Sequence, residues 1–217
     1  MILIGQYDSP FVRRAAIALH HHGVAFERRV LSTFAHFDDV AEVNPLSKVP
    51  VLVLPDGHAL PDSGAIVQYL DLQAPADQRL LPEGETARDV LTIEAIGVGL
   101  AEKTYERGIE VNRRAPGTQD PAWMARLEAQ ITSALRWLER RARADWFVGN
   151  RLSRADLAVT VAVTYATEKL PHLFDSNRWP KLSAFRERAE GTEPFCVAPY
   201  SAQEARATGW RPESEIL

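Results

Sequence analysis

The chain has 217 residues, of which 46% are apolar and 25% are charged, and its formal net charge at pH 7 is -4. This length and balance suit one or two globular domains with a buried core. The acidic balance offers no positive field to a phosphate backbone, and no apolar run approaches the ~18 residues of a membrane span. We therefore expect neither nucleic acid nor a membrane as a partner and place the protein in the cytoplasm.

The first 75 residues alternate between strand and helix signals. Short apolar runs predict strands at 2–7, at 25–31 and on both sides of the turn Pro55-Asp56-Gly57, and helical spacing predicts helices at 10–23, 37–43 and 63–73. The order is β-α-β-α-β-β-α, in which the first half requires a parallel strand pair and the hairpin adds an antiparallel one. We expect an α/β domain over residues 1–75, with helices on the faces of a mixed sheet.

Strand signals stop after residue 75. Proline, glycine and acidic residues over 76–85 are typical of a linker. The remaining chain carries long helical patterns, predicted at 86–115, 120–143, 154–169 and 179–190. The pattern over 154–169 is small and apolar nearly all round, so this helix is expected to be buried. The second domain, 86–217, is predicted to be an all-α helical bundle.

The stretch "NRLSRADLAV" marks the start of the buried helix. Ser153 stands as an N-cap and Asp156 follows three residues later, which is the spacing of a capping box. We expect these two residues to serve folding rather than catalysis.

Four strings in order resemble the cytosolic glutathione S-transferase family, in its serine-type, bacterial-like form: "SPFVRR", "NPLSKVPVL", "LPDSGAIVQYL" and "LSRADLAV". They cover most of the chain, about residues 1 to 190. The resemblance implies a thioredoxin-like first domain that binds glutathione as co-substrate. It also implies a helical domain that forms one wall of a pocket for a small hydrophobic electrophile, and a homodimer.

The resemblance assigns glutathione contacts to two short segments. Pro50 opens an apolar strand although it cannot donate to the sheet, and the family has here a cis Val49–Pro50 bond that turns the Val49 backbone toward the cysteinyl part of glutathione. We predict that Ser63 is the N-cap of an apolar helix. The family binds the γ-glutamyl end at this helix start, with Asp62 on the ammonium and Ser63 on the carboxylate. Many relatives carry glutamate where Asp62 stands.

Other polar residues are weaker candidates. Lys48 and His36 are candidates for the glycyl carboxylate of glutathione, although an exposed lysine before a strand is ordinarily only solvated. The run "HHH" at 20–22 points in three directions from a helix, so it is not expected to hold a metal, and we predict no metal site. The lone cysteine, Cys196, is expected to be inert.

Ser9 has a structural and a catalytic interpretation. Serine followed by proline is a preferred N-cap and first helical residue, which explains the dipeptide without any function. In serine-type members of the family a hydroxyl here donates to the glutathione sulfur, so Ser9 is the catalytic candidate and Tyr7 the alternative donor. A glutaredoxin-like pair of cysteines is absent, because Ser9 and Val12 stand at those positions.

The resemblance therefore implies a glutathione transferase that activates the glutathione thiolate. Phe11 is expected at the binding site, and Tyr105 and Arg113 at the electrophile pocket. The reaction subtype stays open among ether cleavage, dehalogenation, isomerisation and peroxide reduction. The alternative is a transferase-like binding or regulatory protein without turnover, because a fold does not fix a function.

Overall fold

Residues 1–211 are described in a computed structural model, in which the chain divides into two compact units. The first unit contains residues 1–82 and 192–209, and the second contains residues 83–191 with Trp210 and Arg211. The segment 192–209, placed by the sequence with the second domain, lies in the first unit because it bonds there: Arg13 Nε donates to the Ala198 carbonyl at 2.8 Å. The rest of the predicted second domain, 212–217, lies outside the described residues.

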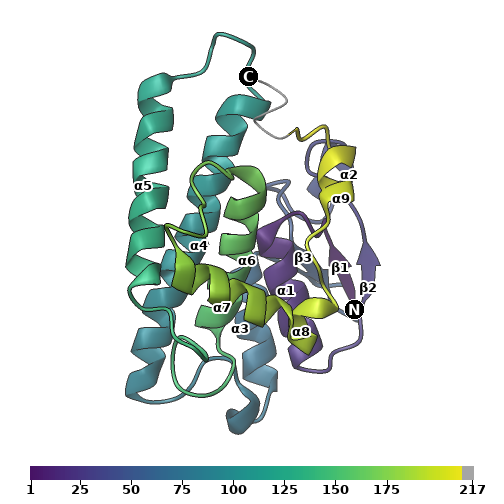
Figure 1. The fold of residues 1–217 in the computed structure, drawn as a ribbon. Coiled ribbons are helices and arrows are strands. Elements are labelled where there is room, and N and C mark those ends of the chain that lie inside the picture. The colour runs from purple at the N-terminus through teal and green to yellow at the C-terminus, as the bar shows by residue number, and fades with distance from the viewer. Residues whose placement is uncertain (212–217) are drawn as a thin grey trace. The chain divides into compact units, whose positions relative to one another are not determined.

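The first unit is built on a four-stranded mixed sheet in the order β2-β1-β3-β4 (Figure 1). Its strands are β1 (Ile2–Ile4), β2 (Glu27–Arg29), β3 (Val51–Val53) and β4 (Ala59–Pro61). Strand β1 runs parallel to β2 and antiparallel to β3, and β3 and β4 form an antiparallel hairpin. The predicted β-α-β-α-β-β-α order and the thioredoxin-like fold class are confirmed, with strands shorter than predicted.

Helices cover both faces of this sheet. The helices of the first unit are α1 (Pro10–His21), α2 (Phe37–Ala41), α3 (Ser63–Gln73), the 3-10 helix η1 (Ala76–Gln78), α8 (Glu193–Cys196) and α9 (Ala202–Ala207). Alternate strand residues point to opposite faces. On one face, Ile4 and Val51 pack in a cluster with Val40 of α2. On the other, Leu3 and Leu52 are buried as well, and α1 packs against α3.

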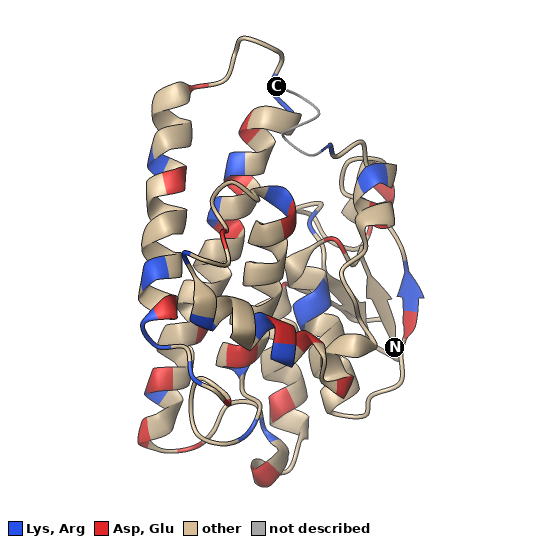
Figure 2. Ribbon diagram, in the orientation of Figure 1, with Lys and Arg blue, Asp and Glu red and all other residues tan. Residues whose placement is uncertain are grey.

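All regular elements among the described residues of the second unit are helices, joined by loops. Its helices are α4 (Glu85–Asn112), α5 (Pro121–Glu139), α6 (Arg154–Lys169) and α7 (Pro180–Glu190). Helix α6 is buried along nearly its whole length, as its composition predicted. Helix α4 approaches it closely at Gly97, where an added Cβ would lie 2.9 Å from the carbonyl carbon of Ala158. Figure 2 shows acidic and basic residues interspersed along α5.

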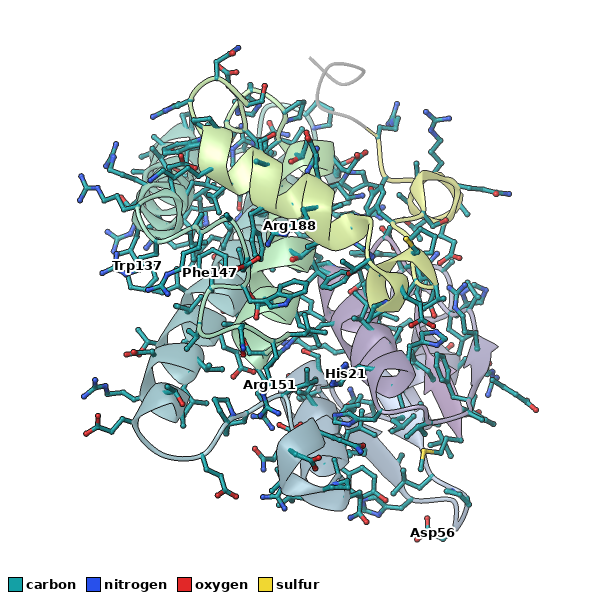
Figure 3. All side chains as sticks on the ribbon, turned by 60° about the horizontal axis from the view of Figure 1, so that its bottom comes forward. His21, Asp56, Trp137, Phe147, Arg151 and Arg188 are labelled. Atoms are coloured by element: carbon teal, nitrogen blue, oxygen red, sulfur yellow. The ribbon has the colours of Figure 1, made fainter. Side chains whose placement is uncertain are left out.

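The predicted capping box at the start of α6 is confirmed. The carboxylate of Asp156, which is fully buried, accepts from Ser153 N at 2.9 Å, from Ser153 Oγ at 2.6 Å and from Phe147 N at 2.8 Å. Burial raises the pKa of Asp156, and these hydrogen bonds oppose that rise. The Phe147 ring meets Phe185 of α7 edge-on at 4.7 Å, and the Arg188 guanidinium lies 5.2 Å from the Phe185 ring centre. Figure 3 labels Phe147 and Arg188 among the side chains of this region. The α6 cap is therefore tied to the packing of α7.

Within residues 1–211, no helix has the length and apolar character that crossing a membrane requires.

Candidate functional site

Ser9 lies in the turn between β1 and α1. Its Oγ accepts from Val12 N at 3.4 Å and Pro10 is the first helical residue, so the predicted N-cap is confirmed. Ser9 N donates to the Gln6 carbonyl at 3.1 Å, which closes the turn. The long bond from Val12 uses one lone pair of a partly exposed hydroxyl, so the hydroxyl proton can still donate to a ligand.

Gly5 joins this turn to the loop before β3. Its φ is +135°, and an added Cβ would lie 2.5 Å from Val12 Cγ2 and 3.1 Å from Val49 Cβ. Only a residue without a side chain lets the first turn of α1 and Val49 approach so closely. No sequence motif marks Gly5, because its role appears only when these distant segments meet.

The Val49–Pro50 bond is cis, as expected from the resemblance. The carbonyl of Pro50 accepts from Asp62 N at 3.2 Å, beside the β3–β4 hairpin. This hydrogen bond brings the cis proline next to the start of α3. Ser9, Val49–Pro50 and Asp62–Ser63 therefore belong to three segments that meet in the first unit.

The N-cap of α3 differs from the prediction. Asp62, rather than Ser63, caps the helix, because its Oδ1 accepts from Gly64 N at 2.7 Å and Ala65 N at 3.2 Å. Asp62 takes a φ of 75°, which places its side chain over the first amides and makes Ser63 the first helical residue. A non-glycine residue in this region is strained by about 1–3 kcal/mol, and such strain concentrates at functional sites.

Arg14 of α1 contributes a positive charge at the same helix start. Ser63 is 2% exposed and its Oγ accepts from Arg14 Nη1 at 3.3 Å. Arg13 and Arg14 are both buried. The sequence did not predict that Arg14 contacts Ser63 or that Arg13 contacts the Ala198 carbonyl. A guanidinium and a helix N-terminus together favour a bound carboxylate.

Lys48 and His36 are both exposed, and within the described residues neither side chain bonds to the three segments above. The Lys48 carbonyl accepts from Asn44 Nδ2 at 2.8 Å, which fixes the backbone of the loop rather than the side chain. His36 Nδ1 accepts from Ser32 N at 3.1 Å, so the neutral ring carries its proton on Nε2. His36 thus shapes the turn before α2.

Tyr7 is less exposed to solvent than Ser9. The residue is 4% exposed, and the Arg28 guanidinium lies over its ring at 3.4 Å from the centre. Burial raises the pKa of the Tyr7 phenol, and the positive charge of Arg28 opposes this rise. Of the two candidate donors, Ser9 presents the hydroxyl that an incoming thiol meets more easily.

The remaining candidates lie on two units. Phe11 is a partly exposed residue of α1 in the first unit. Tyr105, 38% exposed, and Arg113 belong to the second unit. Burial raises the pKa of Tyr105 and lowers that of Arg113, and each partner opposes the other's shift. Among residues 1–211, no group of three His, Cys, Asp or Glu side chains is arranged to hold a metal ion.

Comparison with known proteins identifies the family. Residues 3–78 match the model of the glutathione S-transferase N-terminal domain, and residues 121–188 match the model of the C-terminal domain. The GST-like protein YibF of Escherichia coli is 30% identical over 165 residues, which cover 76% of this chain and 81% of YibF. The chain belongs to the glutathione S-transferase family.

Solved structures of other glutathione S-transferases have the same fold. The enzyme of Methylobacterium radiotolerans, in complex with glutathione sulfonate, superposes with a TM-score of 0.86 at 29% identity over 93% of this chain and 96% of that one. The enzyme of Methylobacillus flagellatus, with glutathione bound, gives a TM-score of 0.84 at 28% identity over 92% and 99% of the two chains. Transferases similar to this chain therefore bind glutathione or an analogue of it.

Proposed function

We propose that this protein is a serine-type glutathione transferase that activates the glutathione thiol through Ser9 for attack on a small hydrophobic electrophile. The observation that carries the proposal is the position of the Ser9 hydroxyl, which caps α1 in the turn that Gly5 holds against the cis Val49–Pro50 segment. Family membership and the relatives that hold glutathione support it.

Each end of glutathione has a chemically matched group in the first unit. The γ-glutamyl carboxylate would bind at the start of α3, where Ser63 and the buried Arg14 lie 3.3 Å apart. Asp62 uses Oδ1 to cap the helix, and Oδ2 of the same exposed carboxylate would meet the γ-glutamyl ammonium. The Val49 backbone would pair with the cysteinyl part, and Lys48 or His36 would meet the glycyl carboxylate.

Ser9 would contact glutathione at its sulfur atom only. When the bound thiol loses its proton to solvent, the hydroxyl of Ser9 donates to the resulting thiolate, and the N-terminus of α1 adds a favourable partial charge. The thiolate then forms a carbon–sulfur bond with the electrophile, from which a leaving group departs or whose double bond takes up the electron pair. Phe11 is the proposed contact of the electrophile in the first unit. We further propose a cytoplasmic homodimer.

Glutathione titration by calorimetry tests the binding half of the proposal. Asp62→Asn removes a charge but keeps an N-cap, because asparagine caps helices as well as aspartate does. Loss of a hydrogen bond to a charged group should weaken glutathione binding by about 10- to 100-fold. The matched control is Asp120→Asn, which changes the same cap at α5 in the second unit and should leave affinity unchanged. A wild-type chain that does not bind glutathione would contradict the proposal.

Turnover separates an enzyme from a binding protein of the same fold. A panel of aryl halides, activated alkenes, β-aryl ethers and hydroperoxides, each with glutathione, would be scored for conjugate or reduced product. At least one class should turn over, at a rate that Ser9→Ala lowers. Tight glutathione binding with no turnover on any class would favour the non-catalytic alternative.

A further inference from the structure

The C-terminal segment 192–209 bonds to the turn that carries Ser9. Ser201 N donates to the Tyr7 carbonyl at 3.3 Å, and Tyr7 N donates to Glu204 Oε2 at 2.6 Å. The side chain of Gln6 donates through Nε2 to the Glu204 carbonyl at 3.0 Å. The N–H and the carbonyl of Tyr7 are therefore both hydrogen-bonded to α9 and its N-cap. The N–H bonds to Glu204, 197 residues further along the chain, and the carbonyl bonds to the N-cap residue Ser201.

Glu204 is held in turn by Arg28 of β2. Arg28 Nη2 lies 3.0 Å from both carboxylate oxygens of Glu204, and the same guanidinium covers the Tyr7 ring at 3.4 Å. Arg28 lies opposite Leu3 in the parallel β1–β2 ladder. It therefore belongs to the strand beside β1, and β1 leads into the Ser9 turn. Figure 1 shows α9 near β1 and β2. The carboxylate thus joins β2, α9 and the Ser9 turn at one point.

A displacement of Tyr7 would also move Ser9. Tyr7 is two residues before Ser9, and the neighbouring Gln6 carbonyl accepts the Ser9 amide at 3.1 Å. Tyr7 is 4% exposed in the intact chain, where the Glu204 carboxylate is the acceptor that its amide has. A buried amide without an acceptor costs free energy, and the turn would move to recover one. A hydroxyl that must meet a sulfur tolerates little movement, since misplacement by about 1 Å lowers a rate by roughly 100-fold.

We infer that Glu204 is a positioning residue for the reaction: its carboxylate fixes the β1–α1 turn so that the Ser9 hydroxyl stands where it meets the glutathione sulfur. This inference rests on the proposed function of Ser9. It assigns to the C-terminal segment a part in the first unit's chemistry, although Glu204 itself touches neither the sulfur nor the electrophile.

The test compares three variants of the full chain. Glu204→Ala removes the acceptor of Tyr7 N, Glu204→Gln keeps an oxygen acceptor without the charge, and Gln203→Ala changes an exposed neighbour on the same helix as the matched control. The readouts are the pKa of the glutathione thiol from ultraviolet titration of the complex, kcat, glutathione Kd, and amide hydrogen exchange of Tyr7 and Ser9. Gln203→Ala should match wild type in all of them.

We expect Glu204→Ala to speed exchange at Tyr7, raise the thiol pKa toward the free value of about 8.5 and lower kcat by about 10- to 100-fold. Glutathione Kd should change by no more than several-fold, because the proposed contacts at Asp62 and Ser63 are untouched. Glu204→Gln should recover most of kcat and of the thiol pKa, which a loss of general stability would not explain.

Two results would overturn the inference. One is unchanged amide exchange at Tyr7 in Glu204→Ala. The other is a thiol pKa and kcat equal to those of the Gln203→Ala control in a protein where Ser9→Ala changes both. If Ser9→Ala itself changes neither quantity, the proposed function of Ser9 is wrong, and the inference about its positioning fails with it for that separate reason.

Discussion

At the scale of the residue, the decisive quantity is the pKa of the bound thiol. A free thiol has a pKa near 8.5, so lowering it to about 6.5 requires roughly 2.7 kcal/mol. One hydroxyl donor to a charged sulfur contributes roughly 1.5–3 kcal/mol, and a helix N-terminus about 0.3–1 kcal/mol more. Under the proposed function Ser9 would supply the hydroxyl and α1 the helix N-terminus, so these two interactions would suffice without a nearby base.

Ser9→Ala should therefore raise the thiol pKa of the complex and lower kcat by about 10- to 1000-fold, the range seen when one positioned donor is lost. Glutathione affinity at pH 7 should stay within several-fold of wild type. Ultraviolet titration, steady-state kinetics and calorimetry measure the three quantities. If Tyr7→Phe loses activity while Ser9→Ala keeps a full rate and an unchanged thiol pKa, Tyr7 is the donor and Ser9 only a cap.

Gly5 shows how much one missing side chain contributes to the site. Gly5→Ala adds a Cβ 2.5 Å from Val12 Cγ2 and also forces alanine into a φ of +135°. Gly57→Ala is the control, since its φ is also positive, at +87°, but among the described residues nothing beyond its chain neighbours lies within 4 Å of an added Cβ. Urea unfolding should show a loss of about 1–2 kcal/mol for Gly57→Ala, from backbone strain, and a clearly larger loss for Gly5→Ala. Equal losses would mean that the Val12–Gly5–Val49 contact is easily relaxed.

At the scale of the element, the buried carboxylate of Asp156 determines where α6 begins. Asp156→Asn keeps the shape but leaves one oxygen for the donors of Ser153 and Phe147, so at least one buried donor loses its acceptor. The expected loss is about 1–3 kcal/mol of unfolding free energy, measured in urea. Asp120→Asn, at the exposed cap of α5, should change stability by only a few tenths of a kcal/mol. A wild-type-like Asp156→Asn variant would contradict the structural role of the capping box.

The elements predicted best are those with local signals. The helices 63–73 and 154–169 agree with α3 and α6 to the residue, because each follows directly after a capping residue, Asp62 or Ser153, and carries a run of apolar positions. The signals failed where geometry depends on distant segments. Asp62 caps α3 through a positive φ that no residue pattern shows, and α8 and α9 went unpredicted because short helices depend on packing and bonds elsewhere in the chain.

The same distinction explains the site. Ser9 and the cis Val49–Pro50 bond were found from short motifs and the resemblance that they carry. Gly5, Arg14 and Glu204 were missed, since no sequence pattern states what a glycine, an arginine or a glutamate contacts, even for Arg14, which closes the string "SPFVRR". Each gains its role from a segment distant in sequence, as when Arg14 meets Ser63, 49 positions away.

At the scale of the whole molecule, we propose that a hollow on the second unit belongs to a surface for self-association. A hollow of about 180 Å³ opens between α4 and α5, lined by Ala95, Ile96, Gly99, Leu100, Lys103, Gln130 and Ala134. Among the apolar residues of α4, Ile93 and Leu100 are almost wholly buried within the unit, and Ile96 is partly exposed. The resemblance implies that this domain of one subunit pairs with the thioredoxin-like domain of another.

We therefore predict a homodimer, seen by light scattering at micromolar concentration as a mass near twice the 24.2 kDa of the chain. Gly99→Arg places a long cation in the hollow, and within residues 1–211 no atom beyond its chain neighbours and the backbone of α4 lies within 4 Å of the new Cβ, so the fold should tolerate it. The variant should dissociate toward monomer, because an unpaired charge buried in an apolar interface is costly. Ala115→Arg, in the exposed loop after α4, is the control and should stay dimeric. A wild-type mass near that of one chain would reject the dimer, and a dimeric Gly99→Arg would place its interface away from this hollow.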